Sequence, residues 1–169
     1  MSEFDLLPLG GTRFLGRMSS KEGDSSHKPS SRTKASDWPT IVFESGLSES
    51  LQGLRCDAKW WLENSEREVN IVVIISIKPA ERKLYIEKWE LALQDDRRPA
   101  TRLHPGTQTL IPTPLQEITI TANNSVTGAP LVLEFEKIFL RPAVPPEDDI
   151  RFTAADLLRW AEAFWAGLQ

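Results

Sequence analysis

Apolar residues recur at helical spacing in two parts of the chain, and each recurrence predicts a helix. The first stripe predicts a helix over Leu51 to Asn64, for which Ser48 and Ser50 are candidate N-caps. The apolar face of this helix consists of Leu51, Leu54, Ala58, Trp61 and Leu62. The second stripe follows the capping-box-like pattern Thr153 to Asp156 and predicts a helix that closes the chain.

Shorter apolar runs between turn residues predict strands. The run Val69 to Ile77 is apolar at consecutive positions, which is typical of a central strand covered on both faces. The turn Lys78 to Arg82 should join it to Lys83 to Leu91 as a hairpin. Gly46 is expected to end the strand that begins at Thr40. Further extended segments are expected over residues 5–17 (with a bulge or turn at 10–11), 24–29, 115–121 and 131–140, and a long loop over 95–114.

This order of elements predicts an α/β or α+β fold, in which a mixed central β-sheet is flanked by helices. The length of 169 residues suits one domain with a real core. No apolar run approaches the roughly 20 residues that a membrane helix needs, so we expect no membrane association.

The composition indicates in which compartment the protein works and which partners it can bind. The single cysteine excludes an internal disulfide, and the acidic N-terminus lacks a signal-peptide h-region. We therefore expect an intracellular protein, cytoplasmic or nuclear, that is not secreted. One cysteine and two histidines do not supply a structural zinc site. The net charge of −4 argues against strong non-specific binding to a polyanion such as DNA. A local basic cleft is compatible with this net charge.

Two acids suggest a metal-dependent chemistry. Asp24 lies in a polar segment, and Glu44 ends a short apolar strand that the basic, Trp-rich helix follows. Two carboxylates on adjacent strands can hold Mg²⁺, which polarises a phosphate and helps to generate hydroxide from water, while a nearby lysine stabilises the developing charge. In the alternative interpretation Glu44 caps the sheet end in solvent or pairs with Arg55, and Asp24 is an ordinary surface-loop residue.

Five segments between about Leu6 and Leu91 form a recognisable series: Asp24-Ser-Ser-His-Lys-Pro29, Trp38-Pro-Thr-Ile-Val-Phe-Glu-Ser-Gly46, Leu54-Arg-Cys-Asp-Ala-Lys-Trp-Trp-Leu62, Val69 to Ile77 and Ile86-Glu-Lys-Trp-Glu90. Through these segments the chain resembles restriction-endonuclease-like proteins of filamentous fungi. Those are similar to the PD-(D/E)XK nuclease superfamily, and within it to endonucleases abundant in cyanobacteria. The resemblance implies a core of helix, three-strand meander, helix and strand over residues 1–93, with residues 94–169 as extra C-terminal strands and a helix packed on the same domain.

The resemblance also assigns the metal ligands. Asp24 matches the first acid and Glu44 the acid of the triplet, and the main-chain carbonyl of Ser45 would join them around Mg²⁺ or Mn²⁺. The chain departs from the family pattern in two ways. Gly46 stands where the triplet has its lysine, and the usual N-terminal helix has no counterpart, so the chain could be a truncated or diverged copy.

The missing basic residue has candidates elsewhere in the chain. Relatives sometimes place it on the following helix, where Lys59 is our first choice and Arg55 our second, with Lys28 third. Lys28, Arg55, Lys59 and an exposed Trp60 would contact nucleic acid. The alternatives are a solvated helix edge for Lys59 and a packing role for Trp60.

Three functions follow from these observations. The first is a metal-dependent nuclease that hydrolyses nucleic-acid phosphodiester bonds. The second is a catalytically inactive nuclease-like fold that serves as a nucleic-acid or protein interaction module. The third is a structural module that forms a homodimer through its Trp-rich terminal helix, with Trp160 beside the apolar stripe.

Overall fold

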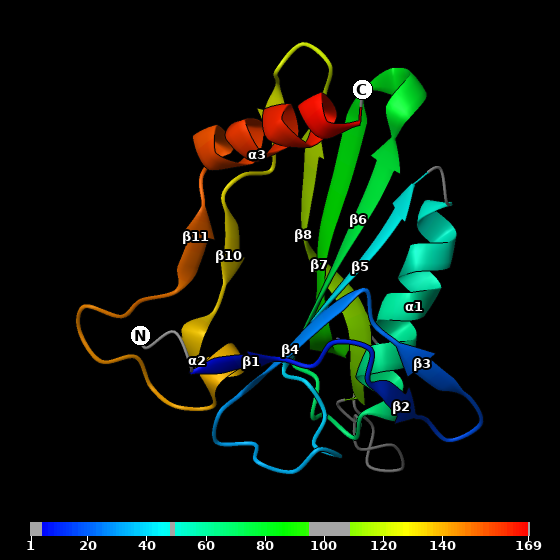
Figure 1. Cartoon of the computed structure of the whole chain (residues 1–169), viewed down its shortest axis with the longest axis vertical. Helices are drawn as coiled ribbons and strands as arrows, with labels where there is room; N and C mark the ends of the chain where they lie inside the picture. The colour runs from blue at the N-terminus through cyan, green and yellow to red at the C-terminus, as the bar shows by residue number, and fades with distance from the viewer. Residues whose placement is uncertain (1–4, 48–49, 95–108, 169) are drawn as a thin grey trace, which may run out of the picture.

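The computed structural model describes residues 5–47, 50–94 and 109–168 (Figure 1). The helices are α1 (Leu51–Asn64), α2 (Phe135–Phe139) and α3 (Ala154–Gly167), and a 3-10 turn spans Pro79–Glu81. The strands are β1 (Leu6–Pro8), β2 (Arg13–Leu15), β3 (Ser20–Glu22), β4 (Ser25–Pro29), β5 (Ile41–Leu47), β6 (Ile71–Lys78), β7 (Lys83–Gln94), β8 (Thr109–Ile120), β9 (Val126–Thr127), β10 (Leu131–Leu133) and β11 (Ile150–Phe152).

A mixed central sheet organises the described part of the chain, and its strands follow the order β1-β4-β5-β6-β7-β8-β9. β5 and β6 are parallel, with α1 as the crossover between them, and the other neighbouring pairs are antiparallel. The predicted fold class is therefore confirmed: a mixed α+β fold with helices flanking a large sheet. The expected succession of a three-strand meander, a helix and a further strand is present as β1, β4, β5, α1 and β6.

The two faces of the sheet carry separate cores. α1 packs on one face, where Trp61 and Leu54 meet Val42, Val72 and Ile74. On the opposite face the side chains of β6 to β8 pack against α2, α3 and β10, and Figure 1 shows β10 and β11 on the side away from α1. Because alternate residues of β5 point to opposite faces, Val42 and Glu44 face α1 while Phe43 faces away.

Both long helices agree with their predictions, since their signals are local. The Ser50 hydroxyl caps α1 by accepting a hydrogen bond from the Gly53 amide at 3.1 Å, whereas Ser48 lies outside the described residues. The capping box of α3 is complete between Thr153 and Asp156. No helix in the described ranges is both long and apolar enough to cross a membrane.

Two predicted boundaries are wrong. The strand starting near Thr40 does not end at Gly46, because parallel pairing with β6 continues through Leu47. The segment 109–114 belongs to β8 rather than to a loop, while 95–108 lies outside the described residues. Pro112 and Pro114 are tolerated in β8 because β9 pairs only with its last two residues, so the prolines face an edge that β9 leaves unpaired.

Two other segments are shorter and more divided than predicted. Residues 5–17 form two strands rather than one, separated by a turn in which Gly10 adopts a positive φ of 49°. The run 131–140 is a strand only as far as Leu133 and then becomes α2. Phe135, Ile138 and Phe139 are spaced i, i+3 and i+4, and all three bury their side chains on one helical face.

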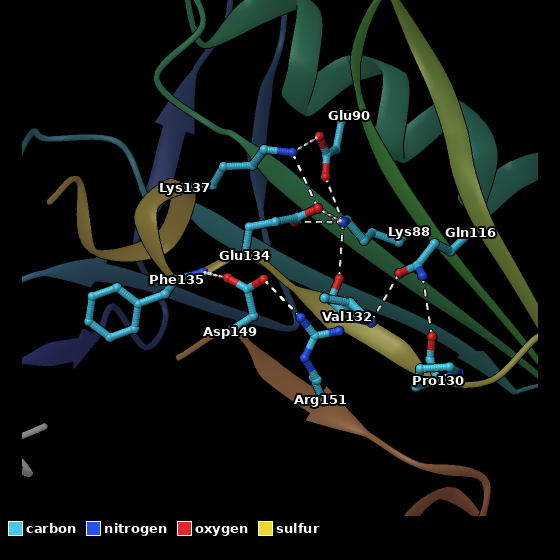
Figure 2. A network of polar contacts seen from close by, with 10 residues as sticks. All are labelled: Lys88, Glu90, Gln116, Pro130, Val132, Glu134, Phe135, Lys137, Asp149 and Arg151. Atoms are coloured by element: carbon cyan, nitrogen blue, oxygen red, sulfur yellow. Dashed lines mark hydrogen bonds and ion pairs between the residues drawn. The ribbon is translucent and has the colours of Figure 1, made fainter. Parts of the chain in front are cut away.

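A partly buried network of charges joins the C-terminal segment to the sheet (Figure 2). Lys88 on β7 is 2% exposed, and its ammonium donates to both carboxylate oxygens of Glu134 at 2.7 and 2.6 Å and to the Val132 carbonyl at 3.0 Å. Glu90 pairs with Lys88 at 2.8 Å and also with Lys137. Two cations and two anions thus compensate one another where β10 and α2 cross β7. The division at residue 93 stays a prediction.

Candidate functional site

Glu44 is a buried carboxylate at the edge of the α1-facing core. It lies in the middle of β5, and only 4% of its surface is exposed. Its Oε1 accepts a hydrogen bond from the indole Nε1 of Trp61 at 2.6 Å, and Trp61 itself is fully buried on α1. A buried charge without a partner is costly, so the indole and its helix fix both the rotamer and the solvation of this acid.

Asp24 lies at the neighbouring position of the sheet. β4 and β5 are antiparallel with Ser25 opposite Phe43, and the same register continued by one residue places Asp24 opposite Glu44. Asp24 is exposed, and its Oδ2 accepts from the Ser45 amide at 2.7 Å and from the Ser45 hydroxyl at 2.9 Å. One predicted acid therefore directly precedes β4 and the other lies on the neighbouring β5, at one edge of the α1-facing core.

Lys21 brings a cation to these acids from the β2–β3 hairpin. Its ammonium lies 2.9 Å from Oδ1 of Asp57 on α1 and 3.5 Å from Oε1 of Glu44. Figure 1 shows the hairpin beside α1, and two hydrogen bonds hold it there. The Arg17 amide donates to the Asn64 side chain at 3.0 Å, and the Trp60 indole donates to the Ser19 hydroxyl at 2.6 Å.

The close approach of the hairpin to α1 depends on Gly16. A Cβ at this position would lie 2.7 Å from both Cζ2 of Trp60 and Oδ1 of Asn64, nearer than real Cβ contacts allow. Phe14 adds an apolar anchor, since it is buried in the α1-facing core and stacks on Trp38 with ring centroids 4.9 Å apart. The position of Lys21 is thus fixed by the packing of its own hairpin.

The pKa values of Glu44 and Lys21 are both raised, which disfavours the charged form of the acid but favours that of the lysine. Burial raises the pKa of the Glu44 carboxyl, and the charges of Asp24 and Asp57 raise it further, against the opposing Trp61 hydrogen bond and Lys21 charge. Burial alone would lower the pKa of the Lys21 ammonium, but its hydrogen bond to Asp57 and the charges of Glu44 and Asp57 outweigh burial, and the pKa is raised. Lys21 is therefore protonated at neutral pH, next to an acid whose charge is repelled by its neighbours.

The helix-borne candidates Arg55 and Lys59 face a different strand. Arg55 donates from Nε to both oxygens of Glu87 at 3.1 Å and from Nη2 to Oε1 at 2.5 Å. Glu87 lies on β7, two strands from Glu44 along the row that passes through Ile74, which corresponds to about 10 Å. The Lys59 ammonium lies 6.0 Å from the ring centroid of Trp89, also on β7. Neither cation has a described contact with the predicted acids.

Lys28 and Trp60 also contact other groups. The Lys28 ammonium is buried and donates to the Lys34 carbonyl at 2.5 Å. Trp60 is half-buried and packs edge-on against Trp61 and tilted against Trp38, with ring centroids 5.2 and 6.1 Å away. These contacts match the packing alternative for Trp60, and the nucleic-acid roles of both residues stay predictions.

Sequence reasoning missed Lys21 and Asp57. Asp57 was recognisable, because it is four residues before Trp61 on the helix and so shares the flank that contacts Glu44. Arg55 and Lys59 share the other flank by the same spacing. Lys21 had no local signal, since it sits on a three-residue strand whose partner is equally short.

The oxygen ligands at this site are few, so a divalent cation bound here would be held by two carboxylates and by water. No group of three or more His, Cys, Asp or Glu side chains is arranged to hold a metal within the described ranges. Mg²⁺ often binds through one or two carboxylates and keeps several waters, so Asp24 and Glu44 suffice by chemistry. The described hydrogen bonds use Oδ2 of Asp24 and Oε1 of Glu44, which leaves the second oxygen of each carboxylate.

The comparisons with known proteins show a structural likeness but no sequence relative. No protein-family model matches the chain, and no curated protein matches it. Among solved structures the chain is similar to a candidate nuclease belonging to DUF820 from Anabaena variabilis, with a TM-score of 0.45 and 10% sequence identity. The likeness covers 94% of this chain and 71% of the other.

Proposed function

We propose that the chain is a metal-dependent hydrolase of nucleic-acid phosphodiester bonds, built on a nuclease-like α+β fold. One observation carries the proposal. Asp24, which directly precedes β4, lies next to Glu44 of β5 in the continued register, and the protonated Lys21 reaches Glu44 from a separate hairpin. Two hard oxygen ligands beside a cation form the combination that phosphodiester hydrolysis needs.

The metal-binding role falls to Asp24 and Glu44, with the Ser45 carbonyl as the third ligand. A bound Mg²⁺ or Mn²⁺ would supply Lewis-acid polarisation of the phosphate and would lower the pKa of a water. Burial raises the pKa of Glu44, and repulsion by Asp24 and Asp57 adds to the rise; a bound divalent charge would offset both effects and favour the carboxylate. The hydrogen bonds from Ser45 and Trp61 hold the two carboxylates in place before any ligand arrives.

Lys21 is the residue that we assign to the phosphate. Because its pKa is raised, it remains an ammonium and stabilises negative charge rather than acting as a general base. Asp57 holds the ammonium beside Glu44 at 2.9 Å and so acts as a positioning residue. In this assignment Lys21 supplies the cation that Gly46 does not supply in the triplet.

The test combines cation binding with cleavage. Titration of Mn²⁺ into the full chain by calorimetry should show saturable binding that Asp24→Asn and Glu44→Gln each weaken at least about tenfold. Glu63→Gln is the matched control, since Glu63 is an exposed acid of α1. Cleavage of single-stranded DNA, duplex DNA and RNA should require the divalent ion and be lost in the two site variants. Absence of Mn²⁺ binding at millimolar concentration would refute the proposal.

A second candidate function is an inactive nuclease-like module that binds nucleic acid or protein. The observation in its favour is that Oε1 of Glu44 already accepts from Trp61 and pairs with Lys21, while the triplet lysine is replaced by Gly46. An internal ammonium can neutralise the acids in place of a metal. Nucleic-acid binding that is unchanged by a chelator, without cleavage of any of the three substrates, would favour this module over the hydrolase.

A further inference from the structure

An apolar groove of about 670 Å³ lies on the face of the sheet opposite Glu44. Its floor is formed by side chains of β5, β6 and β7, and its wall by β10, β11 and the first half of α3. Figure 1 shows this side of the molecule, where α3 crosses one end of the sheet and β10 and β11 stand away from it. Phe43 lines the groove, so adjacent residues of β5 serve the groove and the acid site on opposite faces.

One part of the lining is aliphatic and offers no polar side chain to a ligand. It consists of Val73, Ile75, Ile86, Leu131 and Leu157, which are buried or half-buried. A ligand body with hydrogen-bonding edges, such as a nucleobase, would lose its water there without replacement. The volume lies within the roughly 300–1,000 Å³ of small-molecule sites. A hydrocarbon body therefore matches this part of the groove.

The rim carries two exposed cations, each next to an aromatic residue. Arg151 and Phe152 come from β11, and Arg159 and Trp160 come from α3. Arg151 contacts Asp149 at 3.4 Å (Figure 2), and Arg159 donates to Asp156 at 2.5 Å. A guanidinium has five N–H donors, and one described hydrogen bond to an aspartate uses one of them in each case. Both rim arginines therefore retain donors for an anion.

We propose that this groove binds a small amphipathic carboxylate, with its hydrocarbon body against the sheet and its carboxylate on Arg151 and Arg159. Guanidinium groups match carboxylates in charge and in planar, paired geometry. A single negative charge fits better than a polyphosphate, because Asp149 and Asp156 already offset part of the positive charge at the rim. The site is independent of the acid site on the other face.

The experiment uses sodium decanoate as the probe and decanol as its uncharged counterpart, each titrated calorimetrically into the full chain. Wild-type protein should bind decanoate saturably at one site. The double variant Arg151→Ala/Arg159→Ala should weaken decanoate about tenfold, equivalent to about 1.4 kcal/mol, and decanol less than about twofold. Arg13→Ala, an exposed arginine of β2, is the matched control and should change neither.

A second variant tests the apolar part. Ile75 is half-buried on the floor, so Ile75→Trp should fill the groove and weaken both probes at least about tenfold. Leu115→Trp, at an exposed position of β8 outside the groove, is its control. The exposed arginine variants keep the test decisive if Ile75→Trp fails to fold.

Five results would overturn the proposal. They are absence of saturable decanoate binding by wild-type protein at millimolar concentration, unchanged decanoate binding in Arg151→Ala/Arg159→Ala, unchanged binding in Ile75→Trp, saturable binding of adenosine monophosphate in place of decanoate, and self-association that Ile75→Trp abolishes. The last result, measured by light scattering, would make the groove an interface between two copies of the chain.

Discussion

Removal of the Lys88 ammonium should weaken the attachment of the C-terminal segment to the sheet. Lys88→Met keeps most of the side-chain volume but removes the donor to Glu134 and to the Val132 carbonyl. Breaking a buried ion pair typically costs about 3–5 kcal/mol. We expect the lower end, about 3 kcal/mol, because Lys137 still pairs with Glu90 and Glu134, and a third of the Glu134 side chain is exposed to water.

The assays are equilibrium unfolding in urea and thermal unfolding, both monitored by far-UV and near-UV circular dichroism. For a chain of this length, a loss of about 3 kcal/mol corresponds to a fall in Tm of roughly 6–12 °C. The double variant Lys88→Met/Glu134→Gln should recover part of the loss, since the anion that lost its partner is then neutral. We expect an interaction energy between the two sites of about 1–3 kcal/mol.

A matched control comes from the same strand. Lys83 on β7 pairs with Glu81, and both side chains are more than a third exposed, so Lys83→Met should leave the unfolding free energy close to that of wild type. If Lys88→Met is as stable as Lys83→Met, the network does not attach the C-terminal segment to the sheet, and the reasoning is refuted.

Three further predictions concern the acid site and the capping box. Gly16→Ala should destabilise the protein by about 1–3 kcal/mol because the added Cβ overlaps α1, whereas Gly167→Ala, with open space at its Cβ, should not; calorimetric Tm values decide this. Burial raises the folded pKa of Glu44 above 4.5, so its contribution to stability is full below about pH 4.5 and declines as pH rises through the folded pKa. The unfolding free energy of Glu44→Gln, measured in urea, should therefore rise relative to that of wild type as the pH rises. A difference between the two that stays constant with pH would contradict this. Hydrogen bonds from Thr153 lower the pKa of Asp156 to about 2, so Asp156→Asn should be less stable at pH 7 and equal to wild type near pH 2; a deficit that persists at pH 2 would count against this cause.

The parts of the fold with local signals could be predicted from the sequence. The apolar stripe and the Ser50 cap define α1, and Thr153 with Asp156 defines the start of α3. The end of β5 could not be predicted, because pairing of Gly46 with Ser76 on β6 overrides the usual effect of glycine on a strand. The five-residue α2 was hidden in a run that is also compatible with a strand.

The candidate site was predictable in its acids but not in its cation. Asp24 and Glu44 follow from strand placement, and the register of β4 and β5 brings them to neighbouring positions. The helix offered Arg55 and Lys59, and only the tertiary packing shows that their flank faces Glu87 and Trp89. Lys21 required the position of a hairpin held by aromatic packing and by hydrogen bonds to α1.

The central claim is that Lys21 completes an acid site that cleaves phosphodiester bonds. The most direct measurement is the single-turnover cleavage rate, with Mg²⁺, of Lys21→Met and Lys59→Met beside wild type. Loss of a group that stabilises the transition state should slow Lys21→Met by about a hundredfold or more. Lys59→Met should stay within about threefold of wild type, because Lys59 contacts Trp89 rather than the acids. Equal rates for wild type and Lys21→Met, or a larger loss in Lys59→Met, would contradict the account.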